Sequence, residues 1–446
     1  MANKRGGKLP VPKIAALLIL SLALAAVILA RVSQTGISPA PAADDVPRTE
    51  EPAAVSQPGS FTPAPTGTPG SEPVTATPEA TPEPTPEPVS EYFTISMVGD
   101  CTLAEAKTRR GWTSYFQDVV KSNYSYPFEN TKHLFEEDYL TITNLECCLS
   151  DKYVGYPSYA PYDSIEQFVF LAPAAYAKIL TEGSVEFVTL ANNHTLDFGQ
   201  NAYNDTAAAL SAENIAYAGE KETYIFQTGG GLKVGIYCLY NRLTGNALSI
   251  QSEASRTQLV EESRELIRSA AESLRSEGAE YLIACLHMGQ EGSYETSDIQ
   301  VNVCRSSIDA GFDLVYCSHS HRLQPAEEYG GGMIFYGLGN WIFGGNNNPG
   351  YGTDPAAYDT VAAQVTVCRR GSEVSLEGVK ITPCSISSSV SPDSGSLTAN
   401  SLNDYRPTPY TEGGTAWERT MSILRGEYAG SNFVPNYGDV LAQMNG

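Results

Sequence analysis

Basic residues are scarce in this sequence. Its 446 residues include 28 Lys and Arg against 51 Asp and Glu, which gives a formal net charge of −23 at pH 7. Surfaces that bind nucleic acid or anionic lipid need clustered Lys and Arg, so this balance argues against both classes of partner. Part of the negative charge lies in a Pro- and Glu-rich segment described below, so the total says little about any single site.

Cysteine is present, but without the pattern of a disulfide framework. The nine Cys are odd in number, contain no Cys-x-x-Cys pair and have no regular spacing. A complete set of intrachain disulfides is therefore impossible, and we expect most of these residues to be small buried side chains. The adjacent Cys147 and Cys148 are not expected to bridge each other.

Only one long apolar run occurs, near the N-terminus. Residues 14–30 form a stretch of about 17 mostly apolar residues, which is close to the shortest length that spans a bilayer. Lys4, Arg5, Lys8 and Lys13 precede it, which predicts a cytoplasmic N-terminus over residues 1–13, a transmembrane anchor over 14–31 and an outward-facing remainder at the cell membrane. The alternative is a signal peptide cleaved near the Ala-rich residues 40–43, which would give a secreted protein.

The rest of the chain divides by composition. Residues 32–90 are rich in Pro, Thr, Ala, Glu and Ser and predict a disordered linker, because they lack the apolar content needed to offset chain ordering. Residues 91–385 carry the patterns of a folded domain. Residues 386–446 are rich in Ser, Asn and Gly and predict a tail that is partly ordered.

Within the domain, strand-like and helix-like patterns alternate. The expected strands are 92–98, 139–143, 168–171, 185–191, 224–227, 232–240, 281–286, 314–317, 333–336, 361–368 and 373–382. The expected helices are 113–121, 130–138, 200–214, 256–277 and 298–310. His133 falls on one of these helices and receives no role, and Tyr336 and Trp341 are expected to pack rather than to stack on a substrate.

The most informative stretch is residues 190–199, Leu-Ala-Asn-Asn-His-Thr-Leu-Asp-Phe-Gly. It follows a predicted buried strand and precedes a predicted helix. Polar side chains at such a junction lie at the carboxyl edge of a sheet, where α/β proteins build their sites. The alternative is that Asn193 and Asp197 only cap the helix and the turn.

The same arrangement recurs at four other predicted strands. Residues that can bind a metal ion follow five strands in all: Asp100; Asn144 and Glu146; Asn193 and His194; His287; and His319 and His321. If these strands share one sheet, the side chains converge at one edge. A mixed set of carboxylate, amide and imidazole ligands suits Mn²⁺, Fe²⁺ or Zn²⁺ rather than Ca²⁺. A carboxylate shared by two ions ~3.5–4 Å apart would form a two-metal hydrolytic site.

Each residue also has a plain structural interpretation. Asp100 fits a turn, Glu146 fits a solvated loop charge, and His287 fits a hydrogen-bonded imidazole in the core. His319 and His321 are harder to explain without a ligand, because their i, i+2 spacing in an extended turn lets both rings face one cavity. The metal hypothesis therefore depends on the coincidence of all five strand ends.

These motifs resemble those of the CapA family of bacterial poly-γ-glutamate capsule synthesis proteins, part of the calcineurin-like metallophosphatase superfamily. The resemblance covers residues 92–385 and rests on residues 98–100, 144–146, 191–194, 197–199, 287–289, 319–325 and 336–341. It implies an α/β (α+β) fold: a four-layer αββα sandwich of the metallophosphatase type, with metal ions at the strand ends.

The resemblance also implies a role for each candidate residue. The implied metal ligands are Asp100 and His321 for one ion, Asn193, His287 and His319 for the other, and Glu146 as the bridge between them. His194 would be the general acid, and Asp197 would orient its imidazole by accepting the other N–H. Asn144 and Asn340 are further expected site residues, and the cofactor would be one or two divalent ions of the Mn, Fe or Zn type.

Several positions depart from the family pattern. The first superfamily motif has a His two residues after its Asp, and Thr102 stands there instead. The second Asp motif of the superfamily is replaced by the family's Asn-Leu-Glu. Ser320 replaces the Pro between the paired His, while Gly337 and Trp341 replace the Ser and the Phe of a late Tyr-Ser-Leu-Gly-Asn-Phe motif. The missing His ligand leaves a one-metal site as an alternative to two.

Three functions fit these observations. The first is a membrane-anchored, extracytoplasmic, metal-dependent hydrolase of capsule biosynthesis or export. Its substrate would be a polyanionic or phosphorylated cell-envelope molecule, its partners would be capsule synthase membrane proteins, and it would bind no nucleic acid. The second is a non-catalytic scaffold or polymer-binding component with the same fold. The third, prompted by the 26 Tyr, is a sugar- or peptide-binding surface module, although aromatic residues mostly serve packing.

Overall fold

The computed structural model describes residues 89–108, 111–112, 115–153, 157, 168–245, 251–345, 354–397 and 402–428. The chain divides into two units, residues 1–83 and 84–446, and every described residue belongs to the second. The expected cytoplasmic segment (1–13), the expected anchor (14–31) and nearly all of the expected linker (32–90) lie outside the described residues. Within the ranges above, no helix combines the length and the apolar character needed to cross a bilayer.

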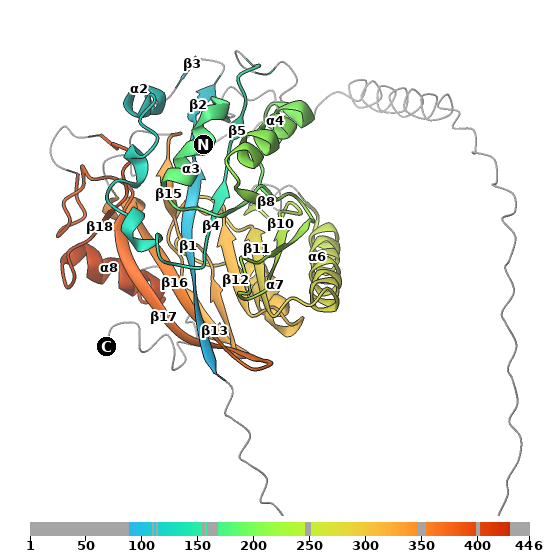
Figure 1. Ribbon diagram of the computed structural model, residues 1–446. Helices are drawn as coiled ribbons and strands as arrows, with labels where there is room; N and C mark the ends of the chain where they lie inside the picture. The colour runs from blue at the N-terminus through green and yellow to red at the C-terminus, as the bar shows by residue number, and fades with distance from the viewer. Residues whose placement is uncertain are drawn as a thin grey trace, which may run out of the picture. The chain divides into compact units, whose positions relative to one another are not determined.

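The larger main sheet has eight strands, with a parallel centre and an antiparallel wing (Figure 1). Its strands are β1 (Ser90–Thr102), β4 (Leu140–Leu145), β7 (Phe187–Thr189), β8 (Ala216–Ala218), β15 (Asn340–Phe343), β16 (Asp359–Arg370), β17 (Glu373–Ser385) and β18 (Thr408–Pro409). β1, β4, β7 and β8 run parallel in that order, and β15 also pairs parallel with β1. The wing of β16, β17 and β18 is antiparallel and joins the other side of β1.

The second main sheet has six strands in the order β13, β14, β12, β11, β10, β9. Their bounds are β9 (Thr223–Phe226), β10 (Val234–Leu239), β11 (Tyr281–His287), β12 (Leu314–Ser318), β13 (Ala326–Tyr329) and β14 (Gly332–Phe335). β10, β11, β12 and β14 are parallel, while β9 and β13 close the two edges as antiparallel hairpins. Every residue of β10, β11 and β12 is buried, which explains why these strands read as continuous apolar runs.

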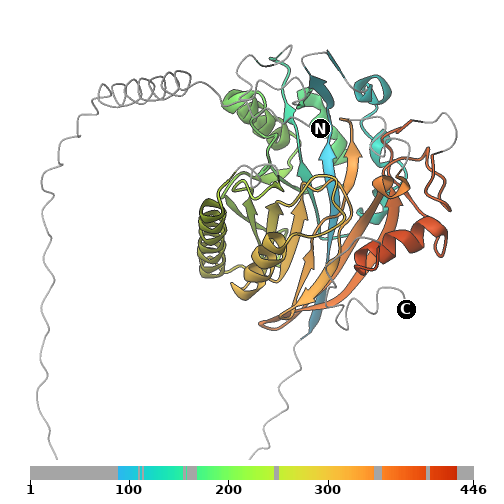
Figure 2. The same ribbon diagram turned by 180° about the vertical axis from the view of Figure 1, so that it is seen from behind.

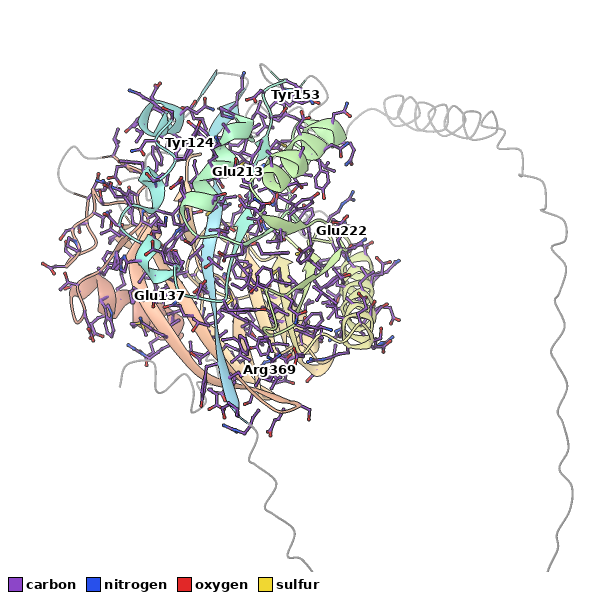
Figure 3. The ribbon with its side chains drawn as sticks, in the orientation of Figure 1. Tyr124, Glu137, Tyr153, Glu213, Glu222 and Arg369 are labelled. Atoms are coloured by element: carbon purple, nitrogen blue, oxygen red, sulfur yellow. The ribbon has the colours of Figure 1, made fainter. Side chains whose placement is uncertain are left out.

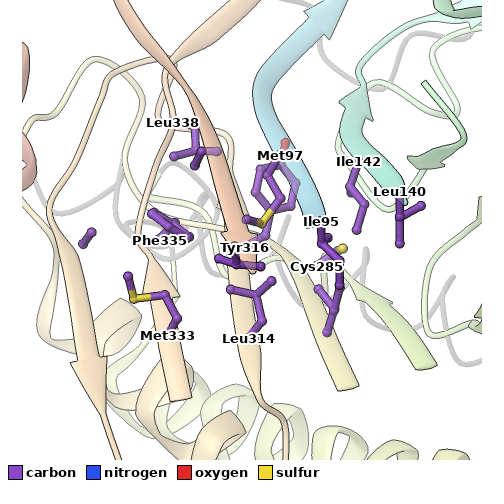
Figure 4. Packing of buried hydrophobic residues seen from close by; sticks show 14 of the residues in the cluster. Ile95, Met97, Leu140, Ile142, Cys285, Leu314, Tyr316, Met333, Phe335 and Leu338 are labelled. Atoms are coloured by element: carbon purple, nitrogen blue, oxygen red, sulfur yellow. The ribbon is translucent and has the colours of Figure 1, made fainter. Parts of the chain in front are cut away.

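The two main sheets pack face to face over one apolar core. Figure 4 shows Ile95, Met97, Leu140 and Ile142 from the larger sheet beside residues of the smaller sheet such as Tyr316. The Tyr316 hydroxyl also crosses the interface, because it donates to Val98 O at 2.9 Å and accepts from the Asn144 N–H at 3.2 Å. The core therefore fixes the ends of strands from both sheets relative to each other.

Helices cover the outer face of each sheet, and Figure 2 shows the molecule from behind. The longer helices are α4 (Gly199–Ala212), α6 (Glu253–Ser276) and α7 (Asp298–Asp309), and the short ones are α2 (Phe116–Val120) and α3 (Ala177–Glu182). α6 and α7 pack on the six-stranded sheet through residues such as Ile267 and Val303. α2, α3 and α4 pack on the eight-stranded sheet through Phe116, Ile179 and Leu210. The order of layers is helices, sheet, sheet, helices.

A small third sheet adjoins the carboxyl ends of the central strands. It contains β2 (Glu105–Thr108), β3 (Gly111–Trp112), β5 (Cys148–Leu149) and β6 (Val169–Ala172) in the order β3, β2, β6, β5. β5 begins two residues after Glu146, and the Phe170 N–H of β6 donates to Asp197. This sheet thus borders the region where the candidate site residues lie.

The C-terminal part of the domain packs onto the antiparallel wing. Helix α8 (Thr415–Leu424) contributes Met421, Ile423 and Leu424 to the core between the sheets. Arg419 holds the helix in place with a two-point ion pair, from Nε and Nη2 to the buried Asp359 at 2.7 and 2.6 Å. The sequence patterns had not predicted this helix.

Ion pairs join the two sheets at the end opposite the candidate site. Arg369, labelled in Figure 3, lies on β16. It pairs with Glu91 of β1 at 2.9 Å and with Glu280, just before β11, at 3.2 Å.

Most expected elements are confirmed, with three corrections. The expected helix over 130–138 is wrong: only a 3-10 turn, Lys132–Leu134, forms there, because the local bonds from Leu134 N to Thr131 O and from Phe135 N to Lys132 O close tighter i, i+3 turns. The first strand continues to Thr102 instead of ending at residue 98. The expected helix over 113–121 is shortened to α2. All nine Cys are free and buried, as expected, and Tyr336 and Trp341 are fully buried packing residues.

Candidate metal centre

The candidate residues meet near the carboxyl ends of strands from both main sheets, except that Asn340 begins its strand and pairs there with Asp100. They are Asp100 on β1, Asn144 and Glu146 at the end of β4, Asn193, His194 and Asp197 after β7, His287 on β11, His319 and His321 after β12, and Asn340 on β15. The strands that carry these residues do not all share one sheet. Two facing sheets supply the residues, and the packed core between them brings their edges together.

Glu146, His287 and His319 form one group of donor atoms, all within 4.8 Å of one another. Glu146 Oε1 lies 3.6 Å from His287 Nε2, and the centres of the His287 and His319 rings are 4.7 Å apart. Asn193 Oδ1 lies 2.6 Å from the same His287 nitrogen. The Glu146, His287 and His319 side chains are at most 2% exposed, so a ligand among them would be shielded from water.

Asp100, Glu146 and His321 form a second group. His321 Nδ1 lies 3.4 Å from Asp100 Oδ2, and His321 Nε2 lies 3.9 Å from Glu146 Oε1. Asn340 Oδ1 lies 2.9 Å from His321 Nδ1. Glu146 is the one residue that the two groups share.

Several buried atoms in these groups that could bind a metal ion have no hydrogen-bond partner. They are Glu146 Oε1 and both ring nitrogens of His319. Buried polar atoms are almost always paired, and an unpaired one costs ~1–3 kcal/mol. A divalent ion would give these atoms a partner, and a set of carboxylate, amide and imidazole donors suits Mn²⁺, Fe²⁺ or Zn²⁺. The residues present therefore fit the metal ions of the superfamily.

Neighbouring side chains hold the donor groups in place. Asn144 Nδ2 donates to Asp100 Oδ1 at 2.9 Å, and Asn192 Nδ2 donates to Asn144 Oδ1 at 2.9 Å. Ser318 Oγ lies 2.8 Å from His287 Nδ1, which leaves Nε2 on the side of Glu146. Sequence reasoning had not singled out Asn192 or Ser318, although each stands directly before a predicted site residue.

His194 and Asp197 form a hydrogen-bonded pair beside these groups. His194 Nδ1 lies 2.9 Å from Asp197 Oδ2, and the same oxygen accepts the Phe170 N–H at 2.8 Å. The Phe170 ring packs edge-on against the His194 ring, with centres 4.5 Å apart. Burial alone would lower the pKa of His194, but the Asp197 carboxylate outweighs it and the pKa is raised. Asp197 therefore favours the His194 tautomer that carries a proton on Nδ1 and leaves Nε2 available.

The remaining titratable groups respond to burial and to each other. Burial and the neighbouring imidazoles lower the pKa of His287 and His319 well below the ordinary value, so both rings are neutral at pH 7. Burial raises the pKa of Glu146 to about 8. For His321 burial acts in the opposite direction, but Glu146 and Asp100 outweigh it and raise the pKa to about 10. The neutral rings of His287 and His319 are in the form that binds a cation, whereas Glu146 and His321 would each release a proton when an ion binds.

The turn after β12 has an unusual backbone. His319 and His321 have φ angles of +97° and +52°, a region that side chains other than Gly seldom occupy. Such conformations persist where surrounding contacts enforce them, and they cluster at functional sites. Between them, Ser320 Oγ donates to Arg322 O at 2.7 Å.

Two departures from the family pattern, Ser320 and Gly337, lie in contact at this turn. A Cβ on Gly337 would lie 2.8 Å from Ser320 Oγ and 2.9 Å from Arg322 O. The hydroxyl at 320 thus lies against the space that a side chain at 337 would need.

A third departure, Thr102, lies in the second half of β1. The residue is fully buried, and its Oγ1 has no hydrogen-bond partner. It pairs with Phe343 of β15, whose ring centre lies 5.3 Å from that of His321. The chain thus has a buried hydroxyl where the superfamily has an imidazole.

Glu291 lies at the same centre, although the sequence patterns did not identify it. Its Oε1 is 3.8 Å from His319 Nε2, and its side chain is 45% exposed. It stands in the loop after β11 and follows no strand directly, so its position in the sequence does not mark it as a site residue.

A two-sheet α/β fold with these donor groups at its strand ends is the architecture of a metallophosphatase-like protein. The sequence pattern of the family described as bacterial capsule synthesis protein PGA_cap matches residues 94–345, which is more than half of the chain. The chain therefore belongs to this family, which is part of the metallophosphatase-like superfamily. The family resemblance noted in the sequence is thus confirmed.

Individual relatives are distant and only partly covered. The chain is 25% identical over 267 residues to the capsule biosynthesis protein CapA of Bacillus anthracis, covering 57% of this chain and 60% of the relative. It is 26% identical over 173 residues to the PGA biosynthesis protein CapA of Bacillus subtilis (strain 168), covering 37% and 44%. It is 28% identical over 166 residues to a probable polyglutamine synthesis accessory protein of Mycobacterium tuberculosis, covering 34% and 44%. The chain thus spans less than two thirds of the length of each relative.

Proposed function

We propose that this chain is a metal-dependent hydrolase of the metallophosphatase type that acts in poly-γ-glutamate capsule biosynthesis or export. The observation that carries the proposal is the shared carboxylate of Glu146, with Oε1 3.6 Å from His287 Nε2 and 3.9 Å from His321 Nε2. A carboxylate between two sets of donors is the arrangement of a two-ion hydrolytic site. The capsule role is supported by the family and by the names of the relatives in the two Bacillus species.

The proposed assignment of ligands follows the two groups of donor atoms. Asp100, Glu146 and His321 would hold one divalent ion, and Asn193, Glu146, His287 and His319 would hold the other. Such ions lower the pKa of bound water and neutralise charge that develops on a phosphoryl or acyl centre.

Residues of this chain would supply the proton for the leaving group. Because Asp197 faces His194 Nδ1 and raises the pKa of the ring, the doubly protonated imidazolium would donate its Nε2 proton to the leaving group or stabilise the charge on it. Asp197 would keep the ring in this orientation, and the Phe170 N–H would fix Asp197 in turn.

The substrate, location and partners follow from the same proposal. We expect a polyanionic or phosphorylated molecule of the cell envelope as the substrate, and capsule synthase membrane proteins as partners. The N-terminal apolar run would anchor the protein in the cell membrane with its domain outside. The four-layer arrangement would be the αββα sandwich of the metallophosphatases.

One observation favours a second function, that of a non-catalytic scaffold or polymer-binding component of capsule assembly. Thr102 stands where the superfamily has a His ligand, so the group formed by Asp100, Glu146 and His321 has one imidazole fewer. A protein that keeps one ion for structure rather than for turnover would have this composition.

The two functions can be separated with the purified full chain. After removal of metal and reconstitution with Mn²⁺, Fe²⁺ or Zn²⁺, elemental analysis gives the metal content, and phosphomonoester, phosphodiester and γ-glutamyl oligomer substrates test hydrolysis. The hydrolase proposal expects turnover that falls ~100-fold or more in His194→Ala, with unchanged metal content. His133→Ala is the matched control, because this exposed histidine has no hydrogen bond to a site residue among the described residues. Metal binding without turnover of any substrate favours the scaffold, and absence of metal refutes the metal site in both.

A further inference from the structure

His319 is a buried ring with two unused nitrogens. Its side chain is 2% exposed, and neither Nδ1 nor Nε2 has a hydrogen-bond partner. A neutral imidazole has one N–H donor and one lone pair, so a fully satisfied ring needs an acceptor on one side and a proton or cation on the other. Under the function proposed above, a metal ion binds one of these nitrogens, and the other still needs an acceptor.

Glu291 is the carboxylate on the open side of this ring. Its Oε1 lies 3.8 Å from His319 Nε2, so closing by less than 1 Å would bring it within hydrogen-bond reach. Its side chain is 45% exposed and thus has room to rotate. It belongs to neither group of donor atoms that lie within 4.8 Å of one another, which argues against direct coordination.

The loop that carries Glu291 is fixed to the turn that carries His319. The Gly292 N–H donates to Ser320 O at 2.8 Å. Gln324 Nε2 donates to Ser293 O at 3.0 Å and to Glu295 O at 2.8 Å. The backbone that follows Glu291 is therefore held against the His319 turn, which keeps the carboxylate beside the ring.

We propose that Glu291 is a positioning residue that accepts the Nε2–H of His319 and so directs the Nδ1 lone pair toward the metal ion. Ligating histidines commonly donate their second N–H to a carboxylate, which fixes the tautomer and the orientation of the ring. The metal part of this inference rests on the proposed function. The tautomer part does not, because it depends only on the contact between Glu291 and His319.

The tautomer can be measured in the metal-free full chain by ¹⁵N NMR with labelled histidine. The chain has only five His, and His319→Gln identifies the signal of this residue by its loss. We expect the Nε2–H tautomer in the wild type and a loss of that preference in Glu291→Ala. Glu295→Ala is the matched control on the same loop and should leave the signal unchanged.

The second measurement is the dissociation constant for Mn²⁺ and Zn²⁺, alone, by calorimetry. Glu291→Ala should weaken binding ~10–100-fold, and Glu291→Gln, which keeps an acceptor oxygen, should recover part of the loss. The inference is overturned if His319 has the same tautomer in the wild type and in Glu291→Ala, or if the tautomer changes while the dissociation constant does not. A wild type that binds no ion overturns the proposed function, while the NMR measurement still decides whether Glu291 sets the tautomer.

Discussion

Replacing Glu146 with Gln should remove metal binding while leaving the metal-free fold intact. Gln has the same shape, so the packing of this fully buried side chain is retained, and only the charge and one acceptor oxygen are lost. Glu146 is the residue common to both groups of donor atoms, so a single substitution affects both proposed ions.

The size of the effect follows from the role of the side chain. Substitutions that only support a metal ligand already reduce affinity ~10–100-fold. Loss of a charged ligand should therefore cost at least ~100-fold, which corresponds to ~2.7 kcal/mol of binding free energy. An ion at a concentration of ~100 times its dissociation constant stabilises the fold by a similar ~2.7 kcal/mol, and this gain should disappear in the variant.

Without metal, the same substitution should raise the free energy of unfolding or leave it unchanged, instead of lowering it. Burial raises the pKa of Glu146 to about 8, so the folded state keeps a proton that the unfolded chain has already released above its ordinary pKa. The free energy of unfolding of the wild type therefore falls as pH rises between the unfolded pKa and about 8. Gln does not ionise, so metal-free Glu146→Gln at pH 8 should be at least as stable as the metal-free wild type.

The assay is thermal unfolding at pH 8 with and without Mn²⁺ or Zn²⁺, combined with elemental analysis of the same samples. The wild type should melt at a higher temperature with metal, and Glu146→Gln should melt at one temperature in both conditions. Equal metal content and an equal metal-dependent shift in the two proteins would refute the assignment of Glu146 as a shared ligand.

Three further substitutions test other parts of the site and fold. Asp197→Asn should lower hydrolysis ~100-fold or more with unchanged metal content, because the amide no longer fixes the His194 tautomer; equal rates would remove Asp197 from the mechanism. Gly99→Ala places a Cβ 2.2 Å from Gly339 O, so a melting temperature lowered by the equivalent of ~1–3 kcal/mol is expected, and an unchanged one would contradict the close approach of β1 and β15. Burial raises the pKa of Glu186 to about 7, so wild-type stability should fall as pH rises toward 7, and urea unfolding at pH 5 and pH 8 should show a weaker pH dependence in Glu186→Gln.

The strands were predictable because burial leaves a clear pattern in the sequence. β11 and β12 are buried throughout and read as apolar runs; His287 ends the first, and His319 and His321 follow the second. The length of β1 was not predictable in the same way. It continues past Gly99 because β4 pairs with it at Asp100 and Cys101, and because β15, more than two hundred residues later, pairs with it from Asp100 to Thr102.

The residue types of the site were also predictable, but their arrangement was not. Polar residues after apolar strands identified Asp100, His287 and His319, yet nothing in a strand's own sequence says which of two sheets it joins. Glu291 was missed for a related reason. It reaches His319 through a loop held by hydrogen bonds to the next strand's turn, and that relation exists only in three dimensions.

The contact between residues 320 and 337 has a consequence for anyone who redesigns this protein. A Cβ at 337 would lie 2.8 Å from Ser320 Oγ, 2.9 Å from Arg322 O and 3.1 Å from Gln324 Oε1, so removing the hydroxyl at 320 relieves only one of three close contacts. Returning Gly337 to the Ser of its family would push on Arg322 O as well as on Ser320, and so on the turn that carries both histidines. A variant library at position 337 should therefore vary residues 320 and 324 with it, because their side chains are the close contacts that a substitution can remove.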